Sequence, residues 1–127
     1  MAETILVEEK IKSGRDLLDA IDHEQINIRA AYWLYALETD VWRLYFASPE
    51  VDMTGPIKMY RRIRRILVRT KILHISVDEI AVTGLTDPFI RSFKLFAKSD
   101  RDTRDIRLRN ITIGSYHIDE AFIYRLY

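Results

Sequence analysis

Three segments of the chain carry apolar residues three and four positions apart, the spacing that places them on one face of a helix. They cover residues 5–21, about residues 56–71 and about residues 88–98. The second and third begin with Pro56 and Pro88, and proline is well tolerated in the first turn of a helix. The pattern therefore predicts three amphipathic helices, each with one face directed toward a core.

Residues that favour strands occupy the intervals between these helices. The predicted strands are residues 26–37, 41–48, 80–83, 106–113 and 116–126. They are rich in β-branched and aromatic residues, which fit a pleated, half-buried surface. Gly114 and Ser115 separate the last two strands, and glycine at the first position suits the mirror-image turn of a tight hairpin.

The first predicted hairpin is apolar on both faces. A three-residue turn at residues 38–40 would place Trp33 opposite Tyr45 and Tyr35 opposite Arg43, all four on one face. A sheet face of this kind must be covered. The cover is either a helix of the same chain, or a partner in a protein interface, where aromatic residues and arginine are enriched, or a ligand that stacks on the aromatic rings.

The order of elements, α-ββ-α-β-α-ββ, predicts an α+β fold with a largely antiparallel sheet of about five strands layered with three helices. The chain has 127 residues, of which 48% are hydrophobic and 31% charged. This length and balance predict a single globular domain spanning residues 1–127. No cysteine is present, which excludes disulfides and thiolate chemistry. No long apolar run and no basic leader is seen, so a cytoplasmic protein without a membrane partner is expected.

Charge is unevenly distributed along the chain. Residues 1–55 carry five Lys/Arg and eleven Asp/Glu, a net charge of −6, whereas residues 56–127 carry 15 and 8, a net charge of +7. Such asymmetry indicates either an anionic partner for the second half or attraction between the two halves, within one fold or across a dimer.

The predicted helix at residues 56–71 concentrates the positive charge. Its candidate polyanion-binding residues form one stripe opposite the apolar stripe: Lys58, Arg61, Arg62, Arg65 and Arg69. Three pairs of these cations are four positions apart, which costs about 0.2–0.5 kcal/mol per pair in an isolated helix. Counter-charges from elsewhere would offset this cost. Phosphates suit guanidinium forks, and the acidic first half of the chain is the alternative source.

Candidates for catalysis and metal binding are few. The chain's histidines are His23, His74 and His117, and no two of them stand at the spacing of metal ligands. Glu38 and Asp40 flank a turn, and Asp52 and Asp87 stand where they can cap helices. Asp119 and Glu120 lie in the last predicted strand, and if either points inward near Arg125, a buried ion pair is expected there and not an active site. We therefore expect no cofactor and no metal, and an enzyme of unknown reaction is the last of the alternatives.

Several short motifs resemble those of a family of small uncharacterised bacterial α+β proteins whose function is not established. They are Trp42-Arg43-Leu44, Ser48-Pro49, Asp52, Gly55-Pro56, Tyr60, Asp87-Pro88 and the closing run from Ala121 to Leu126. The resemblance implies a bacterial-type cytosolic protein and implies no activity, cofactor or catalytic residue.

Two functional hypotheses follow. The first is a non-enzymatic interaction protein that acts through protein contacts and plausibly forms a homodimer, with Trp33, Tyr35, Arg43 and Tyr45 as interface candidates. The second is binding of nucleic acid or another polyanion through the basic helix. No helix-turn-helix or zinc-finger motif accompanies that helix, which weighs against the nucleic-acid alternative.

Overall fold

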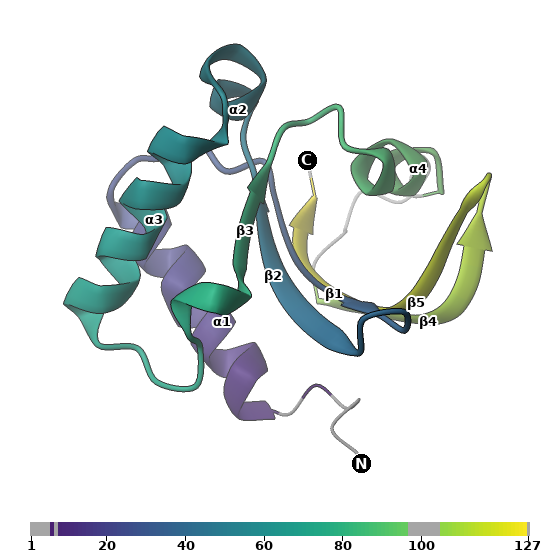
Figure 1. Ribbon diagram of the computed structural model, residues 1–127, viewed down its shortest axis with the longest axis horizontal. Helices are drawn as coiled ribbons and strands as arrows, with labels where there is room; N and C mark the ends of the chain where they lie inside the picture. Colours follow the sequence, from purple (N-terminus) through teal and green to yellow (C-terminus); the bar gives the residue numbers. More distant parts are fainter. Residues whose placement is uncertain (1–5, 7, 97–104, 127) are drawn as a thin grey trace.

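The fold is built on a mixed five-stranded sheet with helices on both faces, as the computed structural model shows (Figure 1). The structure describes residue 6 and residues 8–96 and 105–126. Its helices are α1 (Glu8–His23), α2 (Pro49–Thr54), α3 (Pro56–Thr70) and α4 (Pro88–Phe96), with a 3₁₀ turn η1 (Val77–Glu79). Its strands are β1 (Ala30–Ala36), β2 (Val41–Ala47), β3 (Ile80–Thr83), β4 (Ile106–Ile113) and β5 (Tyr116–Leu126).

The predicted α+β class is confirmed, and the closing hairpin has the predicted ends. Gly114 adopts the left-handed backbone conformation, with φ +62°, that this turn requires. The strands lie in the order β3-β2-β1-β5-β4, so the two hairpins meet at the centre of the sheet where β1 pairs with β5. Of the predicted third helix, residues 97 and 98 lie outside the described residues, as do residues 5 and 7 of the first.

The prediction of three helices was wrong among the described residues, because a short fourth helix, α2, follows β2 directly. Ser48 caps it: the side-chain Oγ accepts a hydrogen bond from the Glu50 N–H at 3.2 Å, and Pro49 occupies the first turn. The strand predicted for residues 41–48 therefore ends at Ala47, and Ser48 belongs to the start of α2.

The sheet is also less antiparallel than predicted, since β3 pairs with β2 in parallel. A parallel neighbour requires a crossover connection of a dozen or more residues. Residues 48–79, which include α2 and α3, supply that crossover. The short β3 is therefore an edge strand, and a helical connection, not a hairpin turn, joins it to β2.

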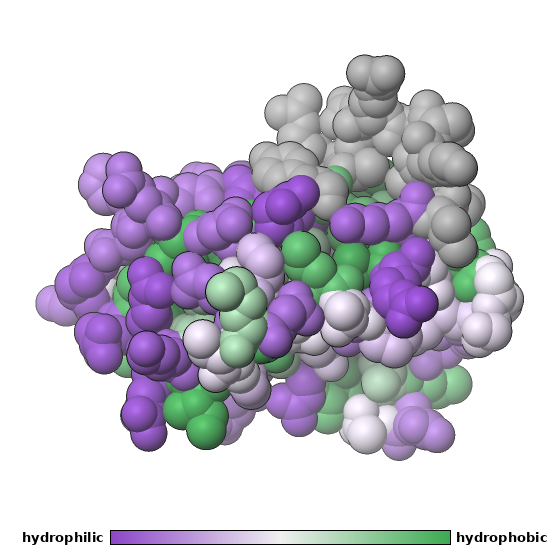
Figure 2. Space-filling model, turned by 90° about the horizontal axis from the view of Figure 1, so that it is seen from above, coloured by the Kyte–Doolittle hydropathy of each residue, from purple (hydrophilic) through white to green (hydrophobic). Residues whose placement is uncertain are grey.

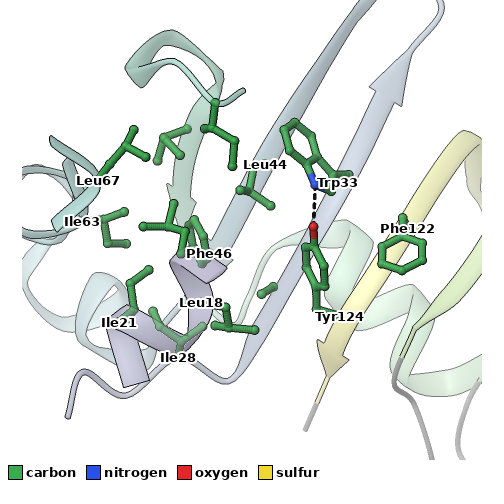
Figure 3. Packing of buried hydrophobic residues seen from close by; sticks show 14 of the residues in the cluster. Leu18, Ile21, Ile28, Trp33, Leu44, Phe46, Ile63, Leu67, Phe122 and Tyr124 are labelled. Atoms are coloured by element: carbon green, nitrogen blue, oxygen red, sulfur yellow. Dashed lines mark hydrogen bonds between the residues drawn. The ribbon is translucent and has the colours of Figure 1, made fainter. Parts of the chain in front are cut away.

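The two faces of the sheet support two separate cores. Helices α1 and α3 cover one face, and α4 covers the other, where β4 and β5 curve around it (Figure 1). The first core includes Leu18, Ile21, Phe46, Ile63 and Leu67 (Figure 3). The second is smaller.

A pair of buried aromatic side chains ties α1 to the sheet. The Trp33 indole N–H donates to the Tyr124 hydroxyl at 2.9 Å, and this hydroxyl donates to the Ile11 carbonyl oxygen at 2.6 Å (Figure 3). Burial raises the pKa of Tyr124, so the hydroxyl keeps the proton that it donates. Gly14 lies against this pair: a Cβ there would collide with the Tyr124 ring and lie 3.0 Å from Trp33 Nε1. The close approach of α1 to β1 and β5 thus requires glycine.

Replacing Tyr124 by phenylalanine is expected to lower the free energy of unfolding by about 2 kcal/mol, because the Trp33 N–H is left without its acceptor inside the core. Urea unfolding followed by tryptophan fluorescence measures the change. Tyr116→Phe in the second core is the matched control, since no hydrogen bond of its hydroxyl is seen among the described residues, and it should cost less than about 0.5 kcal/mol. Equal losses in the two variants would contradict the assigned role of the Tyr124 hydroxyl.

Candidate binding surface on helix α3

Helix α3 is oriented by its apolar stripe. Met59, Ile63, Ile66 and Leu67 are buried in the first core, and the Tyr60 hydroxyl donates to the Val77 carbonyl oxygen at 3.1 Å. Side chains three and four positions apart share a helix face, so burial of this stripe turns the intervening cations away from the sheet. Lys71 ends the helix in a left-handed conformation, with φ +55°.

The five predicted polyanion-binding residues do not share one electrostatic environment. Arg62 lies 3.4 Å from the Glu50 carboxylate and Arg69 lies 2.7 Å from that of Glu24, each an exposed or half-exposed ion pair. Both carboxylates come from the acidic first half of the chain. The intramolecular alternative therefore holds for these two arginines.

The other three predicted cations have no such partner. Lys58, Arg61 and Arg65 are exposed and make no ion pair within the described part of the chain. Arg64, which is not one of the five predicted residues, is also exposed and makes no ion pair among the described residues. We call Lys58, Arg61, Arg64 and Arg65 the free cations of α3.

Two aliphatic side chains stand among the free cations. Ile57 and Val68 are each 64% exposed, although both residue types are usually buried. Positions 57, 61, 64 and 68 are four, three and four apart, so they form one line along the outer side of α3. The sequence indicates this exposure, because neither Ile57 nor Val68 belongs to the buried apolar stripe of the helix.

The outer side of α3 has two open hollows. One, of about 560 Å³, is lined by Arg61, Arg64, Arg65, Val68 and Arg69. The other, of about 320 Å³, lies between α3 and β3 and is lined by Pro56, Ile57, Tyr60, Arg61, Arg64 and Val82. Figure 2 shows hydrophilic side chains gathered over the end of the molecule that α2 and α3 form, with apolar patches between them. This surface presents guanidinium groups and apolar side chains side by side.

The aromatic face predicted for the first hairpin does not exist, because its register differs by one residue. Trp33 pairs with Leu44, and Tyr32 pairs with Tyr45. The turn has four residues, closed by the Asp40 N–H donating to the Ala36 carbonyl oxygen at 2.8 Å, with Asp40 in the left-handed conformation at φ +55°. Aspartate tolerates that conformation better than most residues, which favours the longer turn.

The four interface candidates are therefore divided between the two faces of the sheet. Trp33 and Tyr35 are buried in the first core under the chain's own helices. Tyr45 stacks on Tyr32 on the α4 side with ring centroids 5.2 Å apart, and the exposed Arg43 donates to the Asp78 carbonyl oxygen at 3.0 Å. Trp33 and Tyr35 are thus not accessible to a partner.

The acidic candidates mainly hold the fold together. Asp52 accepts hydrogen bonds from the Leu85 N–H at 2.7 Å and from the Thr86 hydroxyl at 3.2 Å, which joins α2 to the loop before α4. Asp87 caps α4 by accepting from the Phe89 N–H at 3.0 Å. At the first turn, Asp40 accepts from the Tyr35 hydroxyl at 2.6 Å, and this bond is the main reason that the pKa of Tyr35 rises to about 12.

Glu120 is a buried carboxylate that pairs with arginines, as the ion-pair alternative to an active site holds, and these arginines are on β4. Glu120 lies within ion-pair distance of Arg107 and Arg109, at 3.6 and 3.3 Å, while Arg125 pairs with Asp22 at 2.6 Å. The reason is the strand order, which sets β4 beside β5 and gives Glu120 two nearer arginines.

The histidines belong to no metal-binding group among the described residues. His117 is placed 3.4 Å from Asp119 and 2.8 Å from the Thr112 hydroxyl, and all three of these residues lie on the closing hairpin. In the described ranges there is no group of three or more His, Asp or Glu side chains placed to hold a metal ion. Among the described residues, no helix has the length and apolar character needed to cross a membrane.

Comparison of the chain with protein families, with curated proteins and with solved structures finds no match. The family resemblance of the short motifs therefore stays a prediction. The geometry of α3 is the basis for a functional assignment.

Reversal of one free cation is expected to stabilise the protein. Arg65 lies four positions from both Arg61 and Arg69, and Arg65→Glu turns these two like-charge pairs into opposite-charge pairs. The change should raise the free energy of unfolding by about 1 kcal/mol at low ionic strength. The gain should shrink in high salt, because exposed charges are screened.

Lys12→Glu is the matched control on α1. Lys12 stands four residues from both Glu8 and Asp16, and it pairs with Asp16 at 3.1 Å, so the same kind of reversal should destabilise the protein. Urea unfolding at two salt concentrations measures both variants. Destabilisation by Arg65→Glu at low salt would show that Arg65 has a counter-charge in the fold.

Proposed function

We propose that this chain is a non-enzymatic binding domain that takes an acidic segment of another protein on the outer side of α3. The supporting observation is the set of free cations, exposed along one helix and without an ion pair in the described residues, with Ile57 and Val68 between them. Four neighbouring cations repel one another in the free domain. Binding a carboxylate-bearing segment removes that repulsion, whereas folding alone leaves it.

A protein partner is favoured over nucleic acid by the apolar residues of the surface. Protein interfaces combine arginine with apolar side chains at their centre. Single-stranded nucleic acid is held mainly by aromatic side chains on which bases stack. Trp33, Tyr35 and Trp42 are buried in the first core, and Tyr60 is the single aromatic side chain that lines the two hollows. Aliphatic side chains exposed between guanidinium groups fit a peptide better than a phosphate backbone.

The arrangement of the remaining polar groups is compatible with a binding role. Asp40, Asp52 and Asp87 accept hydrogen bonds that hold turns, loops and a helix end. Burial raises the pKa of Tyr32, whose hydroxyl donates to the Asp87 carboxylate at 3.4 Å, and this hydroxyl stays protonated. A cytoplasmic setting suits the proposal, since a chain without cysteine needs no oxidising compartment.

The proposal predicts that a fluorescent acidic peptide binds through α3. A suitable probe has three repeats of Glu-Thr-Val-Thr with both ends blocked. The double variant Arg61→Ser/Arg64→Ser should weaken its binding about tenfold, or about 1.4 kcal/mol, because two guanidinium groups that face the ligand are lost. Fluorescence anisotropy at near-physiological salt measures the affinity.

The matched control removes two cations from another helix. Arg91→Ser/Lys94→Ser changes the net charge of the protein by the same amount on the exposed side of α4 and should leave the affinity within about twofold. Equal losses in the two double variants would mean that net charge alone attracts the peptide. If a single-stranded oligonucleotide binds more tightly than the peptide at the same salt concentration, the partner is nucleic acid and not a protein.

A further inference from the structure

The free edge of β3 runs beside the free cations of α3. Strand β3 is the last in the order β3-β2-β1-β5-β4, and among the described strands it pairs with β2 alone. An edge strand presents backbone N–H and C=O groups to any strand that can lie along it. The edge adjoins the hollow of about 320 Å³ between β3 and α3.

The register shows which backbone groups of β3 face outward. The Ser48 N–H donates to the Thr83 carbonyl oxygen at 3.1 Å, so the backbone of Thr83 is turned toward β2. Alternate residues of a strand in a parallel ladder turn their groups to opposite sides. Val82 therefore directs its N–H and C=O away from β2. The Ile80 N–H, which donates to the Val77 carbonyl oxygen, has the same outward direction.

The side chains beside this edge are apolar and basic. Val82 pairs with Phe46, and both pack on the α3 side of the sheet. Ile57 and Tyr60 complete the apolar part of the hollow, and Arg61 and Arg64 form its charged part. No described carboxylate lies within ion-pair distance of these two arginines.

We propose that an extended acidic segment of the partner protein adds to the sheet as a further strand along β3 and seats its side chains in this hollow. This inference rests on the proposed function. The added backbone would exchange hydrogen bonds with Val82. Side chains of an extended segment alternate between two faces, so every second one enters the hollow: a small aliphatic residue against Val82 and Ile57, and a carboxylate between Arg61 and Arg64.

A second copy of this chain is a poorer occupant of the edge than an acidic partner. Two β3 edges placed together would bring Arg61 and Arg64 of both copies close to each other. The opposite edge of the sheet, β4, carries the exposed Arg107 and Arg109, which are again positive. Nucleic acid lacks the regular row of N–H and C=O groups that an edge strand pairs with. Charge and backbone chemistry together point to an acidic polypeptide of another protein.

The order of residues in the peptide tests the mode of binding. In repeats of Glu-Thr-Val-Thr an extended chain places every Glu and Val on one face. Repeats of Glu-Val-Thr-Thr have the same composition and the same spacing of charge, but Glu and Val fall on opposite faces. Strand addition predicts that the first peptide binds at least about tenfold more tightly. Methylation of alternate backbone nitrogens of the first peptide, on the residues whose N–H groups face β3, should remove the preference.

A substitution in β3 tests the same backbone groups from the side of the protein. Val82→Pro removes an N–H that faces outward, so the ladder to β2 keeps its hydrogen bonds. It should weaken binding of the first peptide about tenfold. Val82→Ala, which keeps the N–H, should weaken it less than about threefold. Circular dichroism and thermal unfolding check that both variants are folded. If Val82→Pro does not fold, the methylated peptide still tests strand addition with the wild-type protein.

Amide hydrogen exchange gives a direct readout in the wild-type protein. The Val82 amide should exchange fast in the free domain and become protected, with a shifted NMR signal, when the first peptide is added. Equal affinity of the two peptides, together with NMR shifts confined to α3, would overturn strand addition and leave acidic-segment binding in place. Absence of binding of either peptide, with no effect of Arg61→Ser/Arg64→Ser, would overturn the proposed function as well.

Discussion

The sheet has two apolar faces, and the need to cover both of them determines where α1, α3 and α4 lie. Alternate residues of β1 and β2 point to opposite sides, and nearly all are apolar, so neither side can be left in water. Helices α1 and α3 bury Trp33, Leu44 and Phe46 on one side, and α4 buries Tyr32 on the other. Burial of these large side chains is the main stabilising contribution, at about 25 cal/mol for each Å² of apolar surface removed from water.

The exposure of the cations of α3 follows from this requirement. Because Met59, Ile63, Ile66 and Leu67 are needed against the sheet, rotation of α3 about its axis is fixed. The opposite side must then face solvent, whatever residues it carries. Among the described residues, the acidic first half of the chain pairs with the two flanks of that side, through Glu50 and Glu24, and leaves the centre positive. Surface ion pairs of this kind contribute about 1 kcal/mol or less, so these two pairs add little to the stability of the fold.

The crossover from β2 to β3 links the cations to an open sheet edge. A parallel neighbour for β2 can be reached only through a long connection, and that connection is α2 and α3 themselves. Helix α3, which carries the positive charge, is therefore packed beside β3, the edge strand that follows it in the chain. A backbone edge, an apolar hollow and two guanidinium groups come together at one place, although their residues are spread from position 57 to position 82.

The sequence by itself determined the class of fold, the three long helices, the closing hairpin and the positive stripe of α3, because each depends on periodicity or turn chemistry within one segment. It did not determine the register of the first hairpin, which depends on whether Asp40 adopts a left-handed conformation in a four-residue turn. That one-residue difference moved Trp33 and Tyr45 to opposite faces of the sheet. Only the tertiary structure decided which cations are paired, since Glu24 and Glu50 approach α3 through contacts between elements far apart in the sequence. The parallel pairing of β3 was decided in the same way, because the choice of a sheet edge depends on the packing of the whole chain.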